Sequence, residues 1–189
     1  VRVAGLARAG GLARRGLAGA APRPPGGRGC EGARGGDAGG EGVREPAPGA
    51  RVLALTRFGG HAEAVCVPAR QAFPMPEGMS FEEGAALPVN YITAWHMLFR
   101  VAALRPGETV LVHMAAGGVG IAALQLCRTV PGVVTLGTAS AAKHEVIRRE
   151  GCQHPIDYRV ADWEAEARRL TGGRGVDVVL DPLGGRDTR

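Results

Sequence analysis

The stretch that decides the fold is Thr109-Val110-Leu111-Val112-His113-Met114-Ala115-Ala116-Gly117-Gly118-Val119-Gly120. Residues 109–114 form a largely apolar run, as expected of a strand that is buried on both faces of a parallel sheet. The glycine-rich segment follows at once and opens a predicted helix over residues 118–130. Glycines in such a turn let the backbone approach a pyrophosphate, and free amides at a helix N-terminus attract the anion. The alternative, a tight turn that packs helix on strand without a ligand, stays open.

Strands and helices alternate downstream of this turn. The pattern predicts strands over residues 133–137, 155–158 and 176–181, and helices over residues 141–150 and 161–170. Such alternation is typical of an α/β fold in which helices cover both faces of a parallel sheet. We therefore predict a partial Rossmann domain, a doubly wound sheet with four of its six strands, over residues 88–189.

The segment upstream, residues 51–87, resembles the end of a small β domain. Short strands are predicted over residues 52–55 and 64–68, and the second ends at Pro68, which a central strand would not accept. Ser80 and Glu83 have the spacing of a capping box that opens a helix. Pro88 then breaks or restarts this helix, and a second helical stretch runs over residues 90–103.

The first 50 residues differ in composition from the rest of the chain. Gly, Ala, Arg and Pro fill 39 of these 50 positions, and eight Arg face four acidic residues. Such a segment buries too little apolar surface to offset its ordering entropy, so we expect it to be poorly ordered. The remainder has 15 basic and 14 acidic residues, so the formal net charge of +5 gives little reason to expect a nucleic-acid partner.

The four cysteines, Cys30, Cys66, Cys127 and Cys152, lie far apart without a C-x-x-C pair or a histidine at ligand spacing. We interpret them as reduced thiols of an intracellular protein without structural zinc. The N-terminus lacks the apolar core of a secretory signal, although its arginines leave a transit peptide open. A membrane span over residues 110–127 is considered and set aside, because Gly117 and Gly118 interrupt it.

The end of the second predicted strand bears on the choice of cofactor. An NAD site normally presents an Asp or Glu there, roughly twenty residues beyond the glycine turn. This chain has Gly137-Thr138-Ala139-Ser140 and then Lys143, and a hydroxyl and an ammonium group would hold the 2′-phosphate of NADPH. Tyr158 adds a hydroxyl at the end of the third predicted strand. The alternatives are a solvated Lys143 and a packing role for Tyr158.

Two further residues carry weaker hypotheses. His113 precedes the glycine turn on the strand, so we interpret it as a core histidine rather than a catalytic base. Asp181 opens Asp181-Pro182-Leu183-Gly184-Gly185 at the carboxyl edge of the predicted sheet, where ligands bind in this fold class. The sequence favours neither a ligand role nor a turn-forming role for Asp181.

These residues resemble the zinc-independent quinone oxidoreductase branch of the medium-chain dehydrogenase/reductase family, and within it the homologues of a synaptic-vesicle membrane protein. The joint spacing of the matching stretches is specific, and together they cover about residues 50–189. The stretches are Phe81-Glu82-Glu83-Gly84-Ala85-Ala86-Leu87, Val89-Asn90-Tyr91-Ile92-Thr93-Ala94, Leu111 to Gly120, Gly137-Thr138-Ala139-Ser140, His154-Pro155-Ile156-Asp157-Tyr158 and Asp181 to Gly185.

The resemblance implies a GroES-like catalytic domain, of which residues 51–87 would be the end, joined to the Rossmann domain. It implies NADPH as hydride donor and a small quinone or enone as substrate, reduced without a metal. The pyrophosphate would be contacted by Ala116, Gly117, Gly118, Val119 and Gly120. The 2′-phosphate would be contacted by Ser140, Lys143 and Tyr158. Asn90 and Thr93 would lie near the nicotinamide.

The likeness weakens in residues 1–50, which we interpret as a remnant of the GroES-like domain in a fragment or degraded copy. Ala7 stands where the family has an active-site Asn, so no catalytic residue is predicted. The resemblance leaves a second function open, a non-catalytic module of vesicle or membrane trafficking. We expect a cytoplasmic protein, with peripheral attachment to vesicle or mitochondrial membranes and homodimerisation of the intact homologue as open alternatives.

Overall fold

The computed structural model of the chain describes residues 2–4, 31–36, 42–56, 58–60, 65–182 and 184. The chain divides into two compact units. The larger unit consists of Val1–Arg8 and Asn90–Arg189, and the smaller unit of Ala9–Val89.

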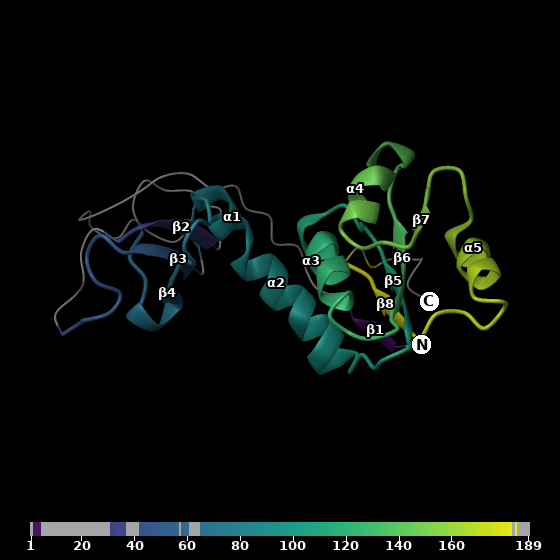
Figure 1. Cartoon of the computed structure of the whole chain (residues 1–189), viewed down its shortest axis with the longest axis horizontal. Coiled ribbons are helices and arrows are strands. Elements are labelled where there is room, and N and C mark those ends of the chain that lie inside the picture. Colours follow the sequence, from purple (N-terminus) through teal and green to yellow (C-terminus); the bar gives the residue numbers. More distant parts are fainter. Residues whose placement is uncertain are drawn as a thin grey trace. The chain divides into compact units, whose positions relative to one another are not determined.

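The larger unit contains a five-stranded sheet in which every neighbouring pair is parallel. Its order is β1-β8-β5-β6-β7, so β7, β6, β5 and β8 stand in the 3-2-1-4 arrangement of a doubly wound fold. The short strand β1 pairs with β8 and extends the sheet at that edge (Figure 1). The strands are β1 (Arg2–Ala4), β5 (Thr109–Val112), β6 (Val134–Thr138), β7 (His154–Ile156) and β8 (Val178–Leu180).

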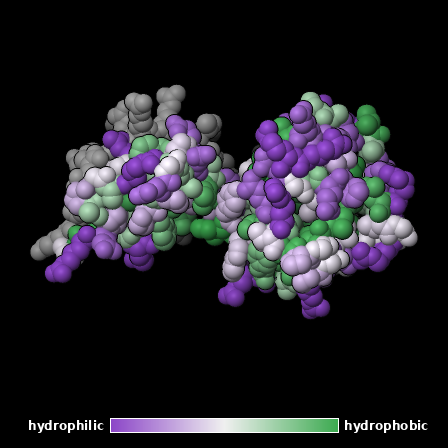
Figure 2. Space-filling model, viewed as in Figure 1, coloured by the Kyte–Doolittle hydropathy of each residue, from purple (hydrophilic) through white to green (hydrophobic). Residues whose placement is uncertain are grey.

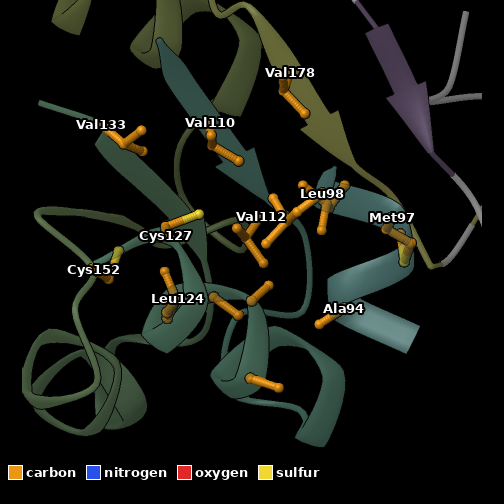
Figure 3. Close-up of a cluster of buried hydrophobic side chains, with 14 of the residues drawn as sticks. Ala94, Met97, Leu98, Val110, Val112, Leu124, Cys127, Val133, Cys152 and Val178 are labelled. Carbon is orange, nitrogen blue, oxygen red and sulfur yellow. The ribbon is translucent and has the colours of Figure 1, made fainter. Parts of the chain in front are cut away.

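Helices cover both faces of this sheet, with α3 and α4 on one side and α5 on the other (Figure 1). Side chains alternate along β5, so Val110 and Val112 enter the core beneath α3, whereas Leu111 packs on the α5 side. The core on the α3 side contains buried side chains from β5, β8, α3 and η2 (Figure 3). The helical elements are α2 (Pro88–Trp95), the π-helix η2 (His96–Val101), α3 (Gly118–Cys127), the 3-10 turn η3 (Ala141–Lys143), α4 (His144–Arg149) and α5 (Trp163–Leu170).

The smaller unit contains an antiparallel sheet of order β2-β3-β4. Its strands are β2 (Glu31–Gly35), β3 (Arg51–Leu55) and β4 (Ala72–Pro74), and it also holds η1 (Ala69–Gln71) and α1 (Phe81–Ala86). The predicted capping box is confirmed: Ser80 Oγ accepts the Glu83 amide at 3.1 Å and Glu83 Oε2 accepts the Ser80 amide at 2.8 Å. Pro88 begins α2 directly after α1, as its missing amide allows.

Two predictions for this unit need correction. Residues 65–68 form no strand, and the chain pairs with β3 later, at Ala72–Pro74. Val65 is exposed and Pro68 donates no hydrogen bond, so this run has little to gain from pairing. In the segment expected to be poorly ordered, Glu31–Gly35 forms a strand along the full length of β3, since backbone pairing does not require apolar side chains.

In the larger unit the predicted elements are present and most of them are shorter, whereas β6 keeps the predicted length and is shifted by one residue. The first strand ends at Val112 rather than residue 114, because Met114 has a left-handed backbone with φ 50°. The helix after it ends at Cys127, and the next one begins as the 3-10 turn η3. The third strand ends at Ile156 and the fourth at Leu180, so Tyr158 and Asp181 lie in the loops beyond.

Residues 110–127, considered above as a membrane span, form a strand, a turn and a helix. Within the described ranges no helix has the length and apolar character needed to cross a bilayer. Hydrophilic side chains cover much of the visible face of the larger unit, and hydrophobic ones occur there in separate spots (Figure 2).

Candidate nucleotide-binding site

The turn between β5 and α3 is closed by backbone contacts that leave no room for a side chain at position 120. Met114 adopts its left-handed conformation, and its carbonyl accepts the Gly117 amide at 2.8 Å. A Cβ on Gly120 would lie 2.4 Å from the Met114 oxygen and 2.7 Å from the Ala115 oxygen. Glycine at position 120 is therefore required for packing α3 against the end of the strand, whether or not a ligand binds.

The first turn of α3 supplies backbone amides for an anion. Gly117 is the N-cap with an extended backbone, and the first helical bond runs from the Ile121 amide to the Gly117 carbonyl at 2.8 Å. Within the described part of the chain, the amides of Gly118, Val119 and Gly120 donate no hydrogen bond. Such amides carry the partial positive charge of the helix N-terminus. This end of α3 is thus suited to a phosphate group.

Asn90 approaches this helix end from α2. A Cβ on Gly118 would lie 2.5 Å from Asn90 Oδ1 and 2.9 Å from Asn90 Nδ2, so the carboxamide occupies the space that a side chain at position 118 would take. The structure thus brings two predicted site residues together, Asn90 and Gly118. Thr93 lies further along α2 and is half buried, and no hydrogen bond joins it to the described residues of the turn.

The residues predicted for the 2′-phosphate follow β6 and β7. Ser140 is buried and is the N-cap of η3, and its carbonyl accepts the Lys143 amide at 2.8 Å. The Lys143 side chain is exposed, and its ammonium forms no ion pair with a described residue. Tyr158 is 55% exposed. Lys143 and Tyr158 are therefore open to solvent rather than packed into the core.

Asp157, which lies between β7 and Tyr158, was not among the predicted site residues. Its Oδ2 accepts the Ala141 amide at 2.9 Å, and its Oδ1 accepts the Arg159 amide at 3.0 Å. The hydrogen bond from the Arg159 amide, aided by that from Ala141 and by the positive charges of Arg159 and His144, lowers the pKa of this carboxyl group. The available signal was that Asp157 immediately precedes a residue already predicted to bind phosphate.

His113 and Asp181 have structural contacts. His113 is buried, its Nδ1 lies 3.1 Å from Thr138 Oγ1, and its ring meets Trp163 edge-on with 4.7 Å between centroids. These contacts agree with the interpretation of His113 as a core residue. Asp181 is buried and its Oδ1 accepts the Gly184 amide at 3.1 Å, which favours the turn-forming role. Leu183, Gly185, Ala7 and Cys30, named above, lie outside the described residues.

The donor groups at this edge of the sheet suit an anion. No group of three His, Cys, Asp or Glu side chains in the described segments has an arrangement that would hold a metal ion. Burial raises the pKa of the Cys127 thiol to about 12 and that of Cys152 to about 11, so both thiols are neutral. The described residues here instead offer the amides of the turn, the carboxamide of Asn90 and the hydroxyls of Ser140 and Tyr158, which are groups that bind phosphate and hydroxyl groups.

Comparison with known proteins places these features in a family. A family model described as zinc-binding dehydrogenase matches residues 118–189. The synaptic vesicle membrane protein VAT-1 homolog of Danio rerio is 55% identical over 188 residues, which is 100% of this chain and 39% of that protein. The human homolog is 52% identical over 188 residues, which is 100% of this chain and 48% of that protein. The chain thus spans less than half the length of these curated relatives.

Two solved structures are similar over most of the chain. The human VAT-1 homolog-like protein has a TM-score of 0.78 at 45% identity, covering 86% of this chain and 51% of that one. The quinone oxidoreductase of Escherichia coli, solved in complex with NADPH, has a TM-score of 0.80 at 31% identity, covering 87% and 51%.

Proposed function

The chain belongs to the medium-chain dehydrogenase/reductase family, beside the VAT-1 homologues, and from that membership we propose that it binds NADPH for the reduction of a quinone or enone without a metal ion. Two structural neighbours that were solved in complex with NADPH support the cofactor. These are the quinone oxidoreductase of Escherichia coli and mycobacterial Rv1454c, both described as complexed with NADPH.

The observation that carries the proposal is the N-terminus of α3. Its amides at Gly118, Val119 and Gly120 have no partner among the described residues, and the helix begins at the carboxyl end of β5. Ligands of doubly wound folds bind at this edge of the sheet. Because Gly118 has no side chain, the Asn90 carboxamide lies close against the first turn of α3, beside the amides that would hold a pyrophosphate.

The residues of the chain would act by binding and orientation. The amides of Gly118 to Gly120, with Ala116 and Gly117 shaping the turn, would hold the pyrophosphate. Ser140, Lys143 and Tyr158 would contact the 2′-phosphate, and Asn90 and Thr93 would orient the nicotinamide half. When bound, NADPH supplies a hydride to the substrate. In this family the protein contributes mainly the alignment of the two reactants.

A second function is favoured by the names of the relatives, which are synaptic vesicle membrane proteins. In this alternative the same fold binds a partner or a membrane surface and catalyses no reaction, because a fold alone does not fix a function. A full-length relative that binds NADPH but reduces none of a panel of quinones would favour this alternative. Co-sedimentation with liposomes would test peripheral attachment, and sedimentation velocity would test homodimerisation.

Lys143 allows a direct test of the cofactor, because it is the only lysine among the 189 residues. Reductive methylation with 13C-formaldehyde gives one dimethyl-lysine NMR signal and one signal from the N-terminal amine, which serves as an internal control. We expect NADPH and 2′,5′-ADP to shift the lysine signal strongly, and NADH and 5′-AMP to shift it much less. Equal shifts with NADH, or no response to any of these nucleotides, would contradict the proposal.

A further inference from the structure

A carboxylate stands among the residues predicted to hold the 2′-phosphate. Asp157 Oδ2 accepts the Ala141 amide at 2.9 Å, and Ala141 directly follows Ser140. Asp157 also directly precedes Tyr158, and Lys143 closes the 3-10 turn that Ala141 opens. The carboxylate thus touches the turn that carries Ser140 and Lys143 and is joined by one peptide bond to Tyr158.

The pairing of strands explains how an acid from one loop reaches the next. β6 and β7 are parallel, with Thr138 opposite Ile156, and the Ala139 amide donates to the Ile156 carbonyl at 3.0 Å. Asp157 is the residue after Ile156, so it leaves the sheet beside Ala139 and Ser140. Its second oxygen accepts the Arg159 amide at 3.0 Å, which fixes the loop after β7. Asp157 therefore bridges the two loops that would surround the adenosine ribose.

The charge of Asp157 acts against a phosphate at this position. Both backbone bonds are made to the ionised carboxylate, so the group carries its negative charge at neutral pH. It also occupies the Ala141 amide, which is then not available to a phosphate oxygen. A free ribose 2′-hydroxyl, in contrast, can donate a hydrogen bond to a carboxylate, as it does to the acid of NAD sites.

We propose that Asp157 is a specificity-determining residue that limits the preference of this site for NADPH over NADH. The proposal rests on the proposed function, since it assumes that the dinucleotide binds at this edge of the sheet. Lys143 favours the 2′-phosphate and Asp157 opposes it. The expected preference is then the sum of a cation after β6 and an anion after β7, beside the positive charges of Arg159 and His144, and it is smaller than it would be without the charge of Asp157.

Asp157→Asn tests this balance, because asparagine keeps an oxygen that can accept the Ala141 amide and removes the charge. The matched control is Asp162→Asn. Asp162 is also a carboxylate that accepts two backbone amides, Glu164 at 3.0 Å and Ala165 at 3.1 Å, but it caps α5 instead. Affinities for NADPH and NADH are measured by calorimetry on the 189-residue chain, at low and moderate salt.

We expect Asp157→Asn to raise the ratio of NADPH to NADH affinity on the order of threefold to tenfold, with the larger change at low salt. Asp162→Asn should leave the ratio unchanged. An unchanged ratio in Asp157→Asn would overturn the proposal and leave Asp157 as a brace between loops. Absence of binding of either dinucleotide by all three proteins would instead overturn the proposed function, and this inference with it. If circular dichroism finds Asp157→Asn unfolded, Asp157→Ser provides an uncharged acceptor for the same comparison.

Discussion

We expect alanine to have different effects at Gly118 and at Gly120, the two glycines in the first turn of α3. Comparing the two variants separates a ligand role from a packing role. The three heavy atoms nearest to a Cβ on Gly118 all belong to the Asn90 side chain, with Oδ1 at 2.5 Å and Cγ at 2.8 Å. A Cβ on Gly120 meets backbone, at 2.4 Å and 2.7 Å from the Met114 and Ala115 carbonyl oxygens. The carboxamide of Asn90 can rotate away, whereas the carbonyls belong to the turn itself.

The magnitudes follow from this difference. Gly118→Ala should change the free energy of unfolding by less than about 1 kcal/mol, because the higher helix propensity of alanine offsets the displacement of Asn90. It should weaken NADPH binding by about 1–2 kcal/mol, or roughly five- to thirtyfold, because a methyl group and a displaced carboxamide crowd the pyrophosphate. Gly120→Ala should destabilise the fold by about 1–3 kcal/mol, as overpacking against fixed atoms does.

The assay is urea unfolding for stability together with calorimetric titration of NADPH for affinity. Adding Asn90→Ala to Gly118→Ala removes the steric conflict, so the double variant should bind better than additivity of the two single variants predicts. Gly118→Ala that binds NADPH as tightly as the original chain would refute the reasoning. In that case the turn would pack helix on strand and would not hold the dinucleotide.

Two further predictions concern the same unit. Met114 and Ala103 both have left-handed backbones, with φ 50° and 49°, so glycine at either position should raise the free energy of unfolding by up to about 1 kcal/mol. Only Met114→Gly should also weaken NADPH binding, because Met114 is exposed beside the glycine turn. Equal NADPH affinities of Met114→Gly and the original chain would contradict this role. With pKa values raised to about 12 and about 11 by burial, Cys127 and Cys152 should resist iodoacetamide at pH 8 while exposed Cys66 reacts, and mass spectrometry of the peptides checks this. The unfolded thiols ionise near pH 9 and the folded ones do not, so the free energy of unfolding should fall as pH rises above that value. The fall should be at most about 1.4 kcal/mol per pH unit for each thiol. In a Cys127→Ala variant the free energy of unfolding should fall less over the same pH range.

The fold was predictable because each strand and helix of the larger unit carries its own pattern. Val110 and Val112 face one core and Leu111 the other, so a continuous apolar run was the correct sign of a strand buried on both faces. The capping box at Ser80 was readable because it depends on residues three apart. The pairing of Glu31–Gly35 with β3 was not predictable from the composition of that segment, because the strand depends on distant backbone partners rather than on its own side chains, and only the faint likeness to the family's closing strands indicated it.

The candidate site was predictable only where it is local. The glycine turn is a continuous segment, and its amides follow from the start of α3. The approach of Asn90 to Gly118 joins residues from two helices, and no spacing along the chain indicates it. Met114 was assigned to the strand because its side chain is apolar, and only its backbone angle identifies it as part of the turn.

Asp157 illustrates why a rule based on spacing along the sequence can miss a side chain that lies beside the predicted site in the fold. The rule for the ribose looks for an acid at the end of the second strand, roughly twenty residues after the glycine turn, and finds none here. In a parallel sheet, however, the carboxyl ends of neighbouring strands meet at one edge, so the loop after β7 also lies beside the end of β6. The bond from the Ala141 amide to Asp157 is the direct consequence of that geometry. Under the proposal made above, the preference of this chain for NADPH or NADH depends on the charges of both loops together, and Lys143 and Asp157 have opposite effects on it.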